Sequence, residues 1–222
     1  MAEQETQEKI VRKGAQAEYV EKRSRFIANL LSVSSEEEAM AEIDRLRKEY
    51  YDARHNCYAY IVFSEDGKDR IERSSDDGEP SGTAGRPMLD VLAGNRLRNV
   101  LVVVTRYFGG VKLGPGGLVR AYGTAVKDAI DKSEFSAIRN GRKITVKLDY
   151  TTLGTIRHRM LDAEAEELDS TYDDGVSLTL VMPAENYERF RKELTQIFSG
   201  KEQVEDLGEV RYGKGNENIF LL

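Results

Sequence analysis

The feature that most constrains the fold is an apolar run near the middle of the chain, Val100-Leu-Val-Val-Val104, inside the segment Asn99–Tyr107. Such an unbroken run, bounded by polar residues, indicates a strand that is buried on both faces. We therefore expect this strand at the centre of a sheet. The glycine-rich segment Gly109–Gly117 follows, and after it apolar residues recur at helical spacing from Leu118 to Ala129. Strand, glycine loop and helix should follow one another here.

Alternating and helical patterns around this strand complete the first domain. Residues 15–33 predict one strand or a hairpin, and residues 55–63 and 69–74 predict another hairpin. One helix should begin at an N-cap at Ser34 or Ser35, and another should begin between Thr83 and Pro87. Residues 1–14 are polar and acidic, and we expect them to be a mobile terminus.

The second half of the chain has the element order of a smaller domain. A change of composition in Phe135–Gly141 predicts a linker. Beyond it, the patterns predict strand, helix, two strands joined by an Asp-Asp-Gly turn, helix and strand. This β-α-β-β-α-β order is typical of the ferredoxin-like fold. The sequence therefore predicts an α+β protein of two domains, residues 1–136 and 137–222.

Charge is distributed unevenly along the chain, whose formal net charge is −6. Residues 1–80 carry 13 basic and 19 acidic side chains, and residues 133–222 carry 12 and 17. Residues 81–132 carry 8 basic and 3 acidic side chains and are the only net-basic part. A local basic patch on an acidic body is consistent with an anionic partner, which the overall charge conceals.

Several classes of protein are disfavoured by what the sequence does not contain. The single cysteine, Cys57, excludes an internal disulfide and a cysteine-based zinc cluster. No run approaches the roughly 18 apolar residues of a membrane helix, and the polar N-terminus does not resemble a signal peptide. We expect a cytoplasmic protein that has no membrane partner.

The glycine-rich segment and its flanking cations predict an anion-binding site. Glycines allow a backbone to approach an anion closely, and the N–H groups at a helix start point toward it. The spacing matches neither a P-loop nor a dinucleotide-binding motif. The alternative is a loop that needs positive φ angles, with its cations merely solvated. The candidate anion-binding residues are Arg86, Arg106, Gly109, Gly110, Lys112, Gly114, Gly116, Gly117 and Arg120.

Two aromatic residues interleave with these cations. Tyr107 and Phe108 are placed where rings could stack on nucleic-acid bases while the cations contact phosphates. Tyr122 falls on the apolar stripe of the following helix, so core packing is favoured for it.

The acidic loop Asp76-Asp77-Gly78-Glu79 has three interpretations. Its carboxylates could hold Mg²⁺ or act as acid and base, but adjacent acids in a turn are more often solvated or capping groups. They could also pair with arginines of the basic patch. A zinc site at His55 would need further ligands, so His55 is interpreted either as structural or, together with Asn56, as a hydrogen-bonding neighbour of the patch.

Four motifs resemble those of the YigZ/IMPACT family, in its bacterial two-domain branch: DDGEPSGTAGRPML from Asp76, VVVTRYFGGVKLGPGGLVRAY from Val102, RSRFIA from Arg23 and HNCYAY from His55. The resemblance implies a first domain similar to the second domain of ribosomal protein S5, with a four-stranded sheet and two helices on one face. It implies a ferredoxin-like second domain similar to one in elongation factor G. Nucleic-acid binding is the usual proposal for bacterial members, and eukaryotic relatives regulate translation.

The sequence thus favours a non-catalytic RNA- or ribosome-associated protein, with RNA, the ribosome or translation factors as partners. No catalytic residue, metal or cofactor is predicted. An alternative is an enzyme for a small phosphorylated substrate, which the glycine loop would cradle while Asp76, Asp77 or Glu79 served as acid, base or Mg²⁺ ligand. A third possibility is a protein-binding module whose acidic C-terminal domain recruits a partner.

Overall fold

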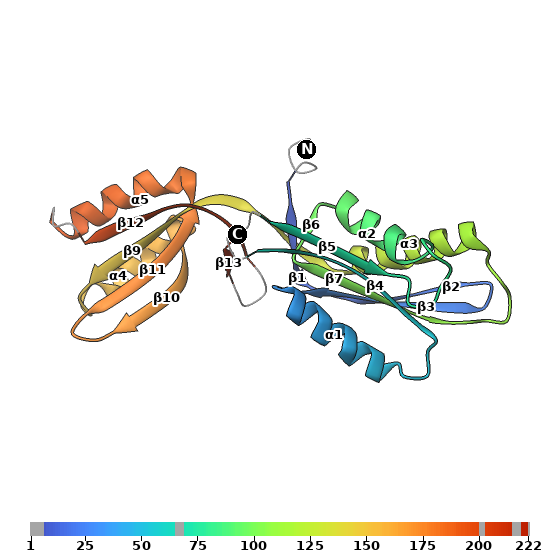
Figure 1. Ribbon diagram of the computed structural model, residues 1–222. Coiled ribbons are helices and arrows are strands. Elements are labelled where there is room, and N and C mark those ends of the chain that lie inside the picture. Colours follow the sequence, from blue (N-terminus) through green and yellow to red (C-terminus); the bar gives the residue numbers. More distant parts are fainter. Residues whose placement is uncertain (1–6, 65–68, 200–202, 215–218, 222) are drawn as a thin grey trace. The chain divides into compact units, whose positions relative to one another are not determined.

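The computed structural model describes residues 7–64, 69–199, 203–214 and 219–221, which form two compact units (Figure 1). The first unit contains the described residues up to Ala137 together with Lys214, and the second contains those from Ile138 to Gly213 and from Ile219 to Leu221. The predicted α+β class and two-domain organisation are confirmed. No helix among the described residues is long and apolar enough to cross a lipid bilayer.

The first unit is built on a five-stranded antiparallel sheet with the order β2-β3-β7-β4-β5. Its central strand, β7 (Val100–Tyr107), contains the apolar run and is buried from Val100 to Arg106. Its neighbours β3 and β4 pair with it along most of its length. The other strands are β2 (Gln16–Glu21), β3 (Ser24–Ser32), β4 (His55–Phe63) and β5 (Arg70–Ser75).

Helices cover both faces of this sheet, which explains the unbroken apolar run (Figure 1). α2 (Gly85–Gly94) and α3 (Pro115–Lys132) pack on one face, against side chains such as Val102 and Val104. α1 (Glu36–Glu49) packs on the other face, against Leu101 and Val103. Compared with the arrangement that the resemblance implies, the sheet has a fifth strand and a third helix covers its other face.

A small second sheet was not foreseen from the sequence. It has the order β6-β1-β8, where β1 is Lys9–Lys13, β6 is Leu97–Arg98 and β8 is Glu134–Ala137. Ile10 and Val11 of β1 are buried. The expectation of a mobile terminus is therefore wrong for residues 9–13, because the strand pairs with β6 and β8 and buries these two side chains. Residues 1–6 lie outside the described residues.

The second unit has the predicted ferredoxin-like order. Its strands β10-β11-β9-β12 are mutually antiparallel, and β13 (Ile219–Leu221) lies beyond β12. Both helices pack on one face, where Ile156, Met160 and Phe190 enter the core. The elements are β9 (Arg139–Leu148), α4 (Leu153–Asp162), β10 (Glu166–Tyr172), β11 (Val176–Pro183), α5 (Ala184–Ile197) and β12 (Val204–Lys214).

Because each unit has its own core, a core deletion should destabilise one unit selectively. Phe190 is fully buried in the second unit, so Phe190→Ala should cost roughly 3–5 kcal/mol of its unfolding free energy. Native-state hydrogen exchange should show lost protection in β9, β11 and α5. Phe190→Leu, which leaves a smaller cavity, is the control. An equal loss of protection in β3, β4 and β7 would contradict separate cores.

Candidate nucleic-acid-binding surface and the ion pair beneath it

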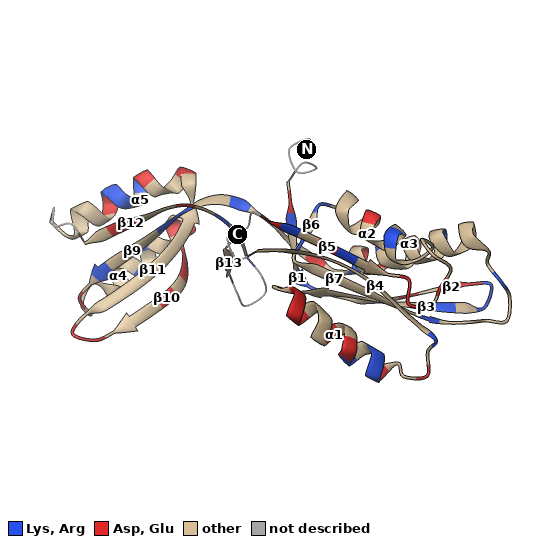
Figure 2. Ribbon diagram, viewed as in Figure 1, with Lys and Arg blue, Asp and Glu red and all other residues tan. Residues whose placement is uncertain are grey.

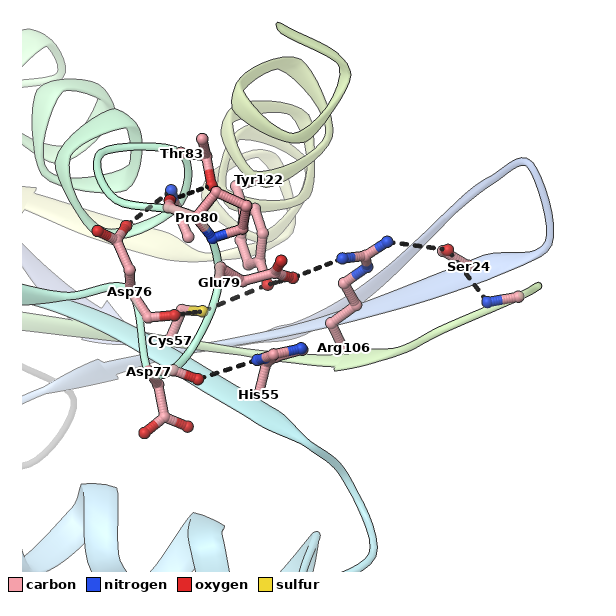
Figure 3. A network of polar contacts seen from close by, with 12 residues as sticks. Ser24, His55, Cys57, Asp76, Asp77, Glu79, Pro80, Thr83, Arg106 and Tyr122 are labelled. Carbon is pink, nitrogen blue, oxygen red and sulfur yellow. Dashed lines mark hydrogen bonds and ion pairs between the residues drawn. The ribbon is translucent and has the colours of Figure 1, made fainter. Parts of the chain in front are cut away.

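The two long motifs meet at one end of the sheet in the first unit (Figure 3). His55 and Arg106 are direct cross-strand neighbours on β4 and β7. The loop between β5 and α2, residues 76–84, lies over this end of the sheet and contacts both strands. Chain segments that are distant in the sequence thus share one polar cluster.

A buried ion pair holds this cluster together. The Arg106 guanidinium donates to Glu79 Oε1 at 2.6 Å, and the two side chains are only 7% and 3% exposed. The Tyr122 hydroxyl donates to the same oxygen at 2.8 Å, and Arg106 also donates to Ser24 Oγ at 3.4 Å. A buried pair of this kind is costly to break, because the remaining charge would lack a partner.

Cys57 and Tyr122 extend this network into the core. The Cys57 thiol donates to the Asp76 carbonyl at 2.9 Å and lies 3.3 Å from the Tyr122 hydroxyl. Burial is the main cause that raises the pKa of both groups far above their usual values. Cys57 therefore remains a thiol at neutral pH and is not an activated nucleophile. The core position expected for Tyr122 is confirmed.

Asp76 caps the helix that follows it. Its two carboxylate oxygens accept hydrogen bonds from the backbone N–H groups of Gly82, Ala84 and Gly85, at 2.7–2.9 Å. Burial alone would raise the pKa of Asp76, but these three hydrogen bonds outweigh it and lower the pKa below its ordinary value. Asp76 thus replaces the side-chain cap that the residue before α2, Ala84, cannot supply.

The remaining acidic residue of the loop, Asp77, is also engaged within the fold. Its carboxylate accepts from the backbone N–H of Asn56 at 2.7 Å and from Arg47 at 3.1 Å. Among the described residues, no group of three or more His, Cys, Asp or Glu side chains is arranged to hold a metal ion. The acidic loop therefore works as a cap and as a partner for arginines.

His55 and Asn56 connect the acidic loop to the sheet. Asn56 Oδ1 accepts from the Thr105 hydroxyl at 2.7 Å. His55 Nδ1 lies 2.9 Å from the Asp77 carbonyl. A carbonyl oxygen can only accept a hydrogen bond, so Nδ1 is the ring nitrogen that donates to it. Both residues thus form hydrogen bonds within the fold, and their role as neighbours of a binding patch stays a prediction.

The glycine loop is pressed against the hairpin that joins β2 and β3. A side chain at Gly109 would place its Cβ 2.0 Å from the Arg23 carbonyl carbon, so only glycine fits there. The Gly109 N–H also donates to Ser24 Oγ at 3.2 Å. Because Ser24 accepts from Arg106 as well, the ion pair, the glycine loop and the hairpin form one connected unit.

The predicted binding residues fall into different environments. Lys112 and Arg120 are exposed, and Arg86 is exposed but paired with Asp90 at 2.8 Å. Arg106 is buried and neutralised, so its position does not fit the direct phosphate contact expected of it. Gly110 and Gly114 have positive φ, and Gly116 and Gly117 lie in the first turn of α3.

The two candidate stacking residues also differ. The Tyr107 hydroxyl donates to Asp52 at 2.7 Å, and the Arg25 guanidinium lies over its ring. The Phe108 side chain is 55% exposed, next to the buried Arg106 guanidinium, which lies 5.7 Å from the ring centre. Phe108 is thus the better placed of the two for contact with a ligand.

Two cations of this surface were missed from the sequence. Lys22 and Arg23 form the exposed turn between β2 and β3, and Figure 2 shows this turn at the same end of the unit as the glycine loop. Their distance from the glycine loop along the chain hides their proximity. The RSRFIA motif, which begins at Arg23, was the one available signal. We call Lys22, Arg23, Phe108, Lys112 and Arg120 the basic surface.

The fold and the site define a two-domain α+β protein that presents an exposed basic surface above a buried ion pair. The model of the Impact N-terminal domain matches residues 22–130, which include this site. A domain of unknown function, DUF1949, matches residues 146–201.

Relatives match both halves of the chain. The IMPACT family member YvyE of Bacillus subtilis is 37% identical over 91% of this chain and 91% of its own length. The IMPACT family member YigZ of Escherichia coli is 35% identical over 82% and 89%. A crystal structure of a hypothetical protein aligns with a TM-score of 0.61 and 32% identity, and covers 90% of this chain and 96% of that one. The chain belongs to the IMPACT family.

The ion pair can be tested with a double-mutant cycle. Arg106→Met should lower the unfolding free energy by about 3–5 kcal/mol, because Glu79 would stay buried without its partner. Adding Glu79→Gln removes the orphaned charge and keeps an acceptor for Tyr122. The double variant should therefore recover a substantial part of the unfolding free energy that Arg106→Met loses. Urea unfolding of the four proteins measures the coupling. Strictly additive losses would contradict the pairing.

The helix cap predicts a defined pH dependence. The pKa of Asp76 is lowered by folding, so its carboxylate stabilises the protein above the unfolded-state value of about 3.9. This contribution is lost as the pH falls through the folded-state pKa. Asp76→Asn should therefore be less stable than wild type at pH 7, and the difference should shrink below about pH 4. Urea unfolding at a series of pH values measures the stability difference between the two proteins. If that difference did not change with pH, Asp76 would not be the ionised cap of α2.

Proposed function

We propose that this protein is a non-catalytic RNA- or ribosome-associated protein that acts in the regulation of translation and binds phosphate groups through its basic surface. The observation that carries the proposal is the contrast between inner and outer cations. Arg106 is neutralised by Glu79, whereas Lys112 and Arg120 are exposed, and so is the ring of Phe108 in the same loop as Lys112. Exposed cations with an adjacent ring are what a nucleic acid requires.

The start of α3 supports anion binding on the same surface. This helix runs for 18 residues from Pro115, and the residue before it, Gly114, provides no side-chain cap. The first N–H groups of a helix lack intrahelical partners and carry a partial positive charge. Lys112 before the helix and Arg120 in its second turn add full charges to that partial one. A phosphate group is the chemistry that such a combination favours.

The second unit offers no aromatic ring on the face of β9 and β11 that points away from its helices. On β9 the core takes Ile144, Val146 and Leu148, so alternate positions face away from both helices. These alternate positions on β9 and β11 carry no aromatic side chain. They are Arg139, Gly141, Lys143, Thr145 and Lys147 on β9, and Ser177, Thr179, Val181 and Pro183 on β11. Stacking on bases is therefore assigned to Phe108 in the first unit.

The enzyme alternative is disfavoured by the acidic loop. General acid–base chemistry or Mg²⁺ binding needs carboxylates that are free to meet a substrate or a metal ion. Asp76 caps α2, Asp77 binds a backbone N–H and Arg47, and Glu79 neutralises Arg106. The carboxylates on which that alternative relied are thus occupied by the fold.

The proposal predicts that Lys112→Ala/Arg120→Ala weakens RNA binding. Two lost phosphate contacts should lower the slope of log affinity against log salt by about 1.4 for a single strand. Fluorescence anisotropy with single-stranded and structured RNA at several salt concentrations measures both effects.

Lys127→Ala/Lys132→Ala is the matched control, because it removes the same charge from exposed positions further along α3. That control should bind almost as wild type does, since only the general electrostatic attraction changes. If wild type and Lys112→Ala/Arg120→Ala bind RNA equally, the basic surface is not the binding site.

A further inference from the structure

The turn between β2 and β3 has a backbone conformation that does not suit its residues. Glu21 pairs with Ser24, which leaves Lys22 and Arg23 as a two-residue turn. Both have positive φ angles, 46° and 67°. Two-residue turns with positive φ at both positions are of type I′, and they strongly prefer Asn-Gly or a similar pair. Residues with long side chains are strained in this region of φ/ψ space.

Nothing within the described chain explains why cations occupy this turn. Both side chains are exposed, and among the described residues neither forms an ion pair or a side-chain hydrogen bond. By contrast, Arg25, two positions further along, is paired with Glu18. Strain that is not compensated by internal contacts points to a role outside the fold.

The turn is fixed relative to the glycine loop. Gly109 lies directly against the Arg23 backbone, and Ser24 accepts hydrogen bonds from both Gly109 N–H and Arg106. Arg106 is in turn held by Glu79. The Lys22–Arg23 turn therefore lies against the loop that carries Lys112 and leads into α3, the helix of Arg120. We call the turn and this loop–helix segment the two walls of the basic surface. The exposed ring of Phe108 precedes Gly109 in the loop between β7 and α3.

We propose that the Lys22–Arg23 turn is a second phosphate-binding wall, and that the basic surface binds single-stranded nucleic acid. The strand would lie across the glycine loop, with its phosphates contacted from both walls and one base stacked on Phe108. This inference rests on the proposed function and adds its substrate class. A duplex keeps its bases stacked inside, so it would offer phosphates to the cations and no base face to Phe108.

The strained turn supplies a test in which stability and binding change in opposite directions. Lys22→Asn/Arg23→Gly installs the residues that a type I′ turn prefers, so the melting temperature should rise. The same change removes two cations, so affinity for a single strand should fall several-fold and the salt slope should decrease by about 1.4. Loss of binding in a more stable protein cannot be attributed to misfolding.

Three nucleic-acid probes distinguish RNA from DNA and a single strand from a duplex. An oligouridine and an oligothymidine of about 20 nucleotides, and an RNA duplex of the same length, are compared on the full chain. Both single strands should bind more tightly than the duplex, and tighter binding of oligouridine would identify RNA as the ligand. Phe108→Ala should weaken single-strand binding several-fold and leave duplex binding unchanged. A preference for the duplex would overturn the inference.

The outcomes also separate this inference from the proposed function. If Lys112→Ala/Arg120→Ala weakens binding but Lys22→Asn/Arg23→Gly does not, the turn is not a binding wall and the proposed function stands. If neither double variant changes binding, the proposed function fails together with the inference. A fall in the melting temperature of Lys22→Asn/Arg23→Gly would overturn the argument from strain.

Discussion

The polar end of the first unit depends on the ion pair between Glu79 and Arg106. Each residue comes from one of the two long motifs, and each would be strongly disfavoured in the interior without the other. Tyr122 and Ser24 supply further hydrogen bonds, so the pair is embedded in a network. Because Glu79 lies in the loop before α2 and Arg106 at the end of β7, the pair sets where the acidic loop lies on the sheet.

Features encoded by local sequence could be predicted well. The apolar run located β7, and its lack of alternation indicated cover on both faces, which α1 and α3 provide. The β-α-β-β-α-β order of the second unit followed from hydrophobic periodicity and an Asp-Gly turn. In both cases the signal lies within a few neighbouring residues, and tertiary structure reinforces it.

Features that depend on tertiary register could not be predicted. Arg106 looks like an exposed cation beside a glycine loop, and only its alignment with Glu79 shows that it is neutralised. Lys22 lies far from the loop in sequence, and pairing of β3 with β7 brings it there. Strand β1 was missed because only Ile10 and Val11 are apolar in a charged segment. A short strand gains its stability from partners that are remote in the sequence.

The buried and the exposed cations of the first unit have different roles. A buried, neutralised arginine cannot attract a phosphate, but through Ser24 it fixes the hairpin against the glycine loop. The exposed cations lie on the two segments that this arginine joins. An acidic chain of net charge −6 can therefore present exposed cations at this end of the first unit, since the carboxylate of Glu79 is buried with Arg106. In the proposed function Glu79 contributes through geometry, because it holds Arg106, which in turn links the hairpin and the glycine loop through Ser24.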